Sequence, residues 1–204
     1  MQSQFYTYFV MGFHHIVSRS AYDHIAFLIV LCAIHRIESW RKILILITAF
    51  TIGHCITLFL GALHWIAPPQ VLIERIMIPA TIISTAIFNI TRPEERSNNG
   101  NFMPRRYEPL FSAELQLQYG FALLFGLIHG MAFSQTLVQI MTGNLLIPLF
   151  AFNVGIELGQ FVIIACIMGI CYWVFNIMQW RQRAWTLFVS GAAFGIGMVM
   201  WLGK

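Results

Sequence analysis

Residues 43–65 read ILILITAFTIGHCITLFLGALHW, a segment that is almost entirely apolar and contains no Lys, Arg, Asp or Glu. About 20 apolar residues in an α-helix cross the hydrocarbon core of a bilayer, so we expect this segment to be a transmembrane helix. His54 lies roughly 18 Å into the segment, close to the middle of the membrane. A polar side chain is expensive to bury at that depth, so His54 is a candidate functional residue.

The rest of the chain has the same character. Of its 204 residues, 58% are hydrophobic and 10% are charged, whereas about 25% of the residues in soluble domains are charged. We therefore expect a single all-α integral membrane domain over residues 1–204, in contact with the lipid bilayer. About six transmembrane helices in one bundle fit the apolar runs, at residues 22–35, 43–65, 71–90, 117–137, 147–178 and 184–202.

Two further segments lie outside these spans. Residues 5–17 are apolar and carry His14 and His15 near their end, so we expect them to extend the short first span or to form an interfacial or re-entrant N-terminal helix. Residues 91–114 are polar and contain three prolines, so we expect a flexible loop there.

The basic residues predict the orientation of the chain in the membrane. Nine of the twelve Lys and Arg residues fall in alternate connectors on one side, which the positive-inside rule assigns to the cytoplasm: Arg36, Arg41, Lys42, Arg92, Arg96, Arg105, Arg106, Arg181 and Arg183. Both termini are then expected outside. Because the net charge of +4 records this topology, it does not indicate a nucleic-acid partner.

Several ionisable residues fall inside the expected spans or at their outer ends. They are Asp23, His24, His54, Glu74, His129 and Glu157, with His15 just upstream and Asn153 one turn from Glu157. An ionised Asp at the centre of a membrane helix costs roughly 2.5–3.5 kcal/mol, whereas an ordinary interhelical polar contact contributes only about 0.6 kcal/mol. A bound metal ion, proton or substrate explains these residues better than helix packing does.

Their depths along the helices agree. At 1.5 Å per residue, His54, His129 and Glu157 lie about 15–18 Å from the ends of their spans, while Asp23, His24 and Glu74 begin helices on the outer side. Five helices thus contribute polar groups to the outer half of one bundle. Glycines flank two of these positions at four-residue spacing and allow helices to approach closely: Gly126 and Gly130 around His129, Gly155 and Gly159 around Glu157.

Imidazole and carboxylate together form a ligand set suited to nickel, zinc, cobalt, iron or manganese. Asp23 and His24 are adjacent, and adjacent side chains point in different directions on a regular helix. One of them can therefore ligate a metal while the other orients a histidine from behind. We expect a divalent metal site of histidines and carboxylates in the outer half of the bundle.

Four stretches of this chain also resemble the HupE/UreJ family of membrane proteins. They are GFHHI at 12–16 with Asp23-His24, Phe50-Thr51 with His54, FGLIHGMAF at 125–133 and FNVGIELGQ at 152–160. The resemblance spans most of the chain and implies a nickel permease of the bacterial inner membrane. It implies metal-handling roles for His15, Asp23, His24 and His129, and it matches His54, Glu74, Asn153 and Glu157 to other polar positions. Family members usually have five residues between the histidine that matches His15 and the Asp-His pair. This chain has seven residues there, 16–22.

Three classes of function stay open. In the first, a divalent cation passes from outside through the histidine and carboxylate site to the cytoplasm. In the second, the protein is an intramembrane metal-dependent hydrolase that acts on a lipid or a peptide. Its metal lowers the pKa of a bound water molecule to about 7, and Glu74 or Glu157 is the general base. In the third, the protein is an accessory subunit with a structural metal. Whether the chain forms a homo-oligomer or binds another membrane protein is left open.

The inner half of the bundle discriminates between transport and hydrolysis. A conduction path needs polar residues that continue toward the cytoplasm, and only four candidates are present there: Ser84, Thr85, Asn89 and Gln118. This sparse set keeps the hydrolase as the alternative to the permease.

Overall fold

The computed structural model describes residues 4–18, 21–35, 37–66, 69–92, 113–140 and 146–203. Within these ranges the chain is helical and contains no strand. The helices are α1 (Gln4–Val17), α2 (Tyr22–Cys32), α3 (Trp40–Ala62), α4 (Gln70–Leu72), α5 (Ile78–Thr91), α6 (Ala113–Ile140), α7 (Leu146–Tyr172) and α8 (Gln182–Leu202). Two π-helical turns, Ile73–Met77 and Trp173–Ile177, continue α4 into α5 and extend α7.

Five of these helical segments are long and apolar enough to cross a membrane: Trp40–Ala62, Gln70–Thr91, Gln116–Ser134, Leu146–Ile177 and Gln182–Leu202. The protein is therefore an all-helical integral membrane protein. α2 is apolar but has only 11 residues, so the sixth span stays a prediction. Most of the expected loop at 91–114 lies outside the described residues.

The N-terminal segment is a helix of its own. α1 ends at Val17 and α2 begins at Tyr22, so residues 5–17 do not extend the first span as one continuous helix. α1 instead packs along α7, and its buried residues are Tyr8, Gly12 and Ile16. The longer interval between His15 and Asp23 contains the change of direction between these two helices.

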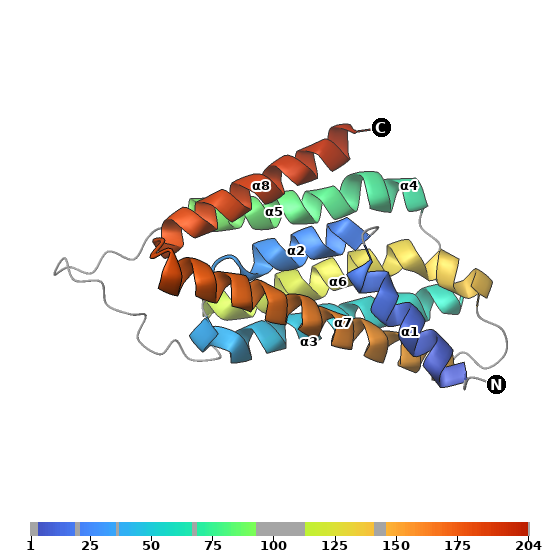
Figure 1. The fold of residues 1–204 in the computed structure, drawn as a ribbon. Helices are drawn as coiled ribbons and strands as arrows, with labels where there is room; N and C mark the ends of the chain where they lie inside the picture. Colours follow the sequence, from blue (N-terminus) through green and yellow to red (C-terminus); the bar gives the residue numbers. More distant parts are fainter. Residues whose placement is uncertain are drawn as a thin grey trace.

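Three helix pairs make up most of the bundle (Figure 1). α3 packs along α6 and α1 along α7, each pair running in parallel, whereas α5 and α8 are antiparallel. The two termini lie at the same end of the bundle, which we call the terminal end. The side of the membrane on which this end lies remains a prediction. α2 begins beside the last turn of α1 and runs away from the terminal end, in the interior between the pairs.

Candidate metal centre

Glycines let α3 and α6 touch through their backbones. A side chain at Gly126 would overlap the carbonyl of Phe50, and one at Gly130 would overlap the backbone of His54 and the Thr57 hydroxyl. Any residue with a Cβ would therefore push the two helices apart. This close contact holds His54 and His129 on two helices that are fixed relative to each other.

The same kind of contact fixes α1 against α7. A side chain at Gly12 would overlap the carbonyl of Phe152, and one at Gly155 would overlap the carbonyl of Phe9. His15, one turn beyond Gly12 on α1, thereby enters the bundle, where its ring centroid lies 4.0 Å from that of Phe133. An apolar segment at the N-terminus thus supplies a histidine to the interior.

Four imidazole rings converge at this point from α1, α2, α3 and α6. The centroid of the His24 ring lies 4.7 Å from that of His129, 5.2 Å from that of His15 and 6.2 Å from that of His54. Two groups have potential ligand atoms within 4.8 Å of one another: His15, His24 and His54 form one, and Asp23, His24 and His129 form the other. His24 belongs to both groups, so the five residues form one continuous centre.

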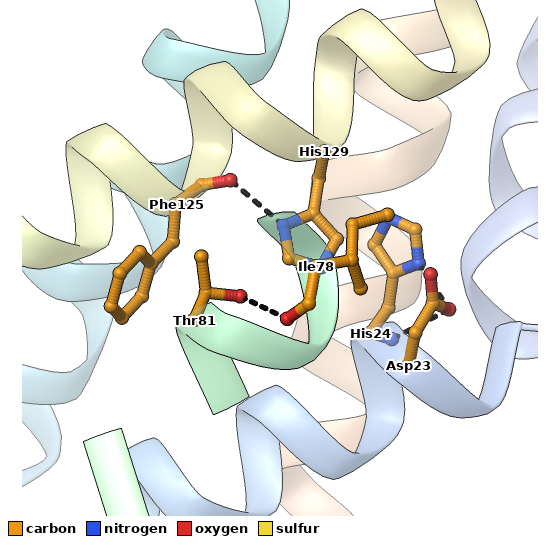
Figure 2. Close-up of polar contacts among 6 residues, drawn as sticks. All are labelled: Asp23, His24, Ile78, Thr81, Phe125 and His129. Carbon is orange, nitrogen blue, oxygen red and sulfur yellow. Dashed lines mark hydrogen bonds and ion pairs between the residues drawn. The ribbon is translucent and has the colours of Figure 1, made fainter. Parts of the chain in front are cut away.

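Two of the rings are oriented by oxygen atoms behind them (Figure 2). The Asp23 carboxylate is 2.9 Å from Nδ1 of His24 and also accepts a 2.8 Å hydrogen bond from the His24 backbone N–H. Nδ1 of His129 lies 2.8 Å from the Phe125 carbonyl oxygen, to which it donates. Both contacts direct the opposite nitrogen, Nε2, toward the centre, which is the usual arrangement behind a metal-ligating histidine.

Five ring nitrogens of the four histidines are buried without hydrogen-bond partners among the described residues. These atoms are Nε2 of His15, Nε2 of His24, both ring nitrogens of His54 and Nε2 of His129. A buried polar atom without a partner costs about 1–3 kcal/mol, so such a cluster is unfavourable as mere packing. Neutral imidazole nitrogens close enough to share one ion are what a borderline divalent transition metal requires, so the residues fit a metal ion.

A cavity connects this centre to the terminal end of the bundle. It has a volume of about 820 Å³, counting the space at its mouth. The residues that line it include Glu74 and four residues of the centre: His15, Asp23, His24 and His129. The Glu74 side chain accepts a 2.7 Å hydrogen bond from Gln70, which also lines the cavity. Three of the four histidines thus line a space that opens toward the terminal end.

The family profile of the HupE/UreJ proteins matches residues 1–204, the whole chain. The chain belongs to the HupE/UreJ family. No curated protein and no solved structure matches the chain. Family membership and the nearby histidine and carboxylate groups together indicate that this HupE/UreJ protein handles a metal.

Three of the residues singled out by the sequence lie outside the two ligand groups of this HupE/UreJ protein. Glu157 is partly buried and accepts a 3.4 Å hydrogen bond from Thr48 on α3. Asn153 lies next to His54, with its amide nitrogen donating to the Leu149 carbonyl. Glu74 is exposed at the cavity. Their assignment as ligand or neighbour of the metal stays a prediction.

Sequence reasoning missed the aromatic residues of the HupE/UreJ centre. Phe50 and Phe27 are fully buried, and their ring centroids lie 5.4 and 5.8 Å from that of His129. The signal was present in the spacing, because Phe27, Phe50 and Phe125 each lie one helical turn from a histidine of the centre. In an apolar membrane chain, such phenylalanines do not differ from ordinary packing residues until the histidines are known to converge.

Proposed function

We propose that this protein is a permease that carries a divalent transition-metal ion, with nickel as its main substrate, from the terminal end of the bundle toward the cytoplasm. The observation that carries this proposal is a cavity toward the terminal end that is lined by His15, His24 and His129, whose Nε2 atoms are buried without hydrogen-bond partners among the described residues. A resident structural ion would be better served by a closed site, whereas a transported ion needs a route to its ligands.

The chemistry of the residues supports a cation as the substrate. Carboxylates at the mouth and in the wall of the cavity, Glu74 and Asp23, attract divalent cations. Imidazole ligands then select transition metals over Mg²⁺ and Ca²⁺, which prefer oxygen. Nickel stands above Mn²⁺, Fe²⁺ and Co²⁺ in affinity for such ligands, so the site favours it over those ions.

The test is Ni²⁺ uptake by proteoliposomes that contain an internal metal-sensitive dye. The His15→Ala variant removes a nitrogen from the centre, and uptake is expected to fall at least about tenfold. His14→Ala is the matched control, because His14 is the next residue of α1 but is exposed. Absence of Ni²⁺, Co²⁺ and Zn²⁺ uptake by the wild-type protein would contradict the proposal.

One observation favours the hydrolase as a second candidate. Glu74 lines the same cavity as His15, Asp23, His24 and His129, so a general base and the metal ligands face a common space. A metal held there would supply an activated water, and Glu74 would accept its proton. In that case Glu74→Gln keeps the metal bound but abolishes turnover of a lipid or peptide substrate, and the wild-type protein transports no metal.

A further inference from the structure

A second cavity lies at the opposite end of the bundle from the metal centre. It lies between the later turns of α2 and α5 and the first half of α6. Most of its wall is apolar, but four polar side chains line it: Ser84, Thr85, Asn89 and Gln118. These are the four polar candidates of the inner half, brought together from two helices.

Three of these side chains already donate a hydrogen bond to a backbone carbonyl. The Ser84 and Thr85 hydroxyls both donate to the Thr81 carbonyl, at 3.0 and 2.8 Å. The Asn89 amide donates to the Val30 carbonyl at 2.7 Å. Neither hydroxyl has a second hydrogen, so each can only accept a further partner, and the Asn89 side-chain oxygen also retains its lone pairs.

Gln118 provides the oxygen without a partner. Its side chain is 5% exposed, and its Oε1 atom is buried with no hydrogen-bond partner among the described residues. A buried acceptor in this state is unfavourable unless a ligand satisfies it. Oxygen atoms of side chains, together with retained water molecules, are the ligands that a partly hydrated divalent cation takes.

An aromatic layer separates this cavity from the metal centre. Phe27, Phe50 and Phe125 each lie one turn inward of a histidine, on α2, α3 and α6 respectively. The ring centroid of Phe27 lies 5.3 Å from that of Phe50 and 5.1 Å from that of Phe125, and all three residues are buried. Phe125 reaches both sides, because its side chain lines the inner cavity while its carbonyl accepts from His129.

We propose that the inner cavity is a second binding station for the transported divalent cation, in which the oxygens of Gln118, Asn89, Thr85 and Ser84 receive the ion after it passes the barrier of Phe27, Phe50 and Phe125. This inference rests on the permease function proposed above. Neutral oxygen ligands hold a transition-metal ion more weakly than imidazole does, so the inner station favours release. Arg183 lies beyond the cavity and donates hydrogen bonds to the carbonyls of Asn89 and Ile90. Its positive charge there offsets the partial negative charge at the C-terminal end of α5.

The decisive variant is Gln118→Leu. If Gln118 has only a structural role, replacing a buried acceptor that lacks a partner with leucine should stabilise the protein and leave transport unchanged. If Gln118 serves the inner station, uptake of Ni²⁺ into proteoliposomes should fall at least about tenfold while the melting temperature stays the same or rises. Gln116→Leu is the control, since Gln116 is exposed on the same helix.

Thr85→Val tests the station from α5 with little change in side-chain volume. Its control is Thr91→Val, because Thr91 makes the same type of hydrogen bond to the backbone, to Ile87, but is exposed. Uptake should fall at least about threefold for Thr85→Val and stay at the wild-type level for Thr91→Val. Equilibrium binding of Ni²⁺ to the histidine centre, measured by calorimetry in detergent, should be unchanged in all four variants.

Three results would overturn the inference. Wild-type uptake by Gln118→Leu would refute the inner station and leave the permease intact. Loss of Ni²⁺ binding in Gln118→Leu would mean that this residue acts on the histidine centre and not at a separate station. Absence of uptake by the wild-type protein would remove the permease and, with it, the inner station.

Discussion

The ring centroids of His24 and His129 lie 4.7 Å apart, and the Nδ1 atom of each ring contacts an oxygen atom of another residue. For His24 this oxygen belongs to Asp23, and for His129 it is the carbonyl of Phe125. The partner of one ring is charged and that of the other is neutral. His24 is therefore the stronger electron donor of the two toward a bound cation.

This difference predicts the effect of Asp23→Asn. The amide can still contact His24 but lacks the charge that strengthens the imidazole as a ligand, so affinity for Ni²⁺ should fall about 10–100-fold. Calorimetric titration of purified protein measures the change. Glu38→Gln is the control, because Glu38 is an exposed carboxylate away from the centre. Equal affinities for Asp23→Asn and the wild-type protein would contradict the orienting role.

Gly130→Ala should disrupt the centre without touching a ligand. The added methyl group meets the backbone of His54, so α3 and α6 must separate, at a cost of about 1–3 kcal/mol. Both the melting temperature and Ni²⁺ binding should decrease. Gly120→Ala, on the same helix, meets no atom within 4 Å and should be neutral or stabilising by up to about 1 kcal/mol. Equal melting temperatures for the two variants would argue against the close helix contact.

Glu157→Gln examines a carboxylate outside the two ligand groups. A charged carboxylate at this depth in the membrane needs a cation or a proton, and the sequence pattern predicts that Glu157 serves the transported metal. We expect lower nickel content in cells that express Glu157→Gln than in cells that express the wild-type protein. Equal nickel contents would remove Glu157 from the route and leave it as a partner of Thr48.

The orientation in the membrane is tested by cysteine labelling. The positive-inside rule predicts that Gln70→Cys reacts from outside the cell and Ser97→Cys from the cytoplasm. Ser97 lies outside the described residues, but the prediction depends only on the distribution of Lys and Arg. Labelling of both positions from the same side of the membrane would overturn the assignment of both termini to the outside.

The sequence predicted where the long helices lie along the chain better than how each helix is rotated about its axis. The long apolar runs located α3, α6 and α8 to within a few residues, because bilayer thickness sets their length. The shared depth of His54 and His129 led to the expectation of one site, and the structure brings both histidines to one centre. Depth cannot say which way a side chain faces, so it could not separate Glu157, directed at Thr48, from the histidines.

Two further contacts did not follow from helix positions alone. Helical geometry directs Asp23 and His24 to different faces, yet the short Asp23 side chain at the first turn of α2 folds back onto the His24 ring. Likewise, residues 5–17 were recognised as apolar, but their pairing with α7 depends on Gly12 and Gly155, which are distant in sequence. Such pairing follows from the shape of the assembled bundle, which one sequence does not display.

The glycine contacts of α1 with α7 repeat those of α3 with α6. In each pair, a glycine on either helix lies against a carbonyl three residues before the glycine of the other: Gly12 with Phe152, Gly155 with Phe9, Gly126 with Phe50, and Gly53 with Leu123. Each pair is thus interlocked and resists internal sliding. Relative displacement of the two interlocked units is the softer motion, and it would separate His15, carried by one unit, from His54 and His129, carried by the other. The coordination number of a bound ion would then vary with the position of one rigid body against another.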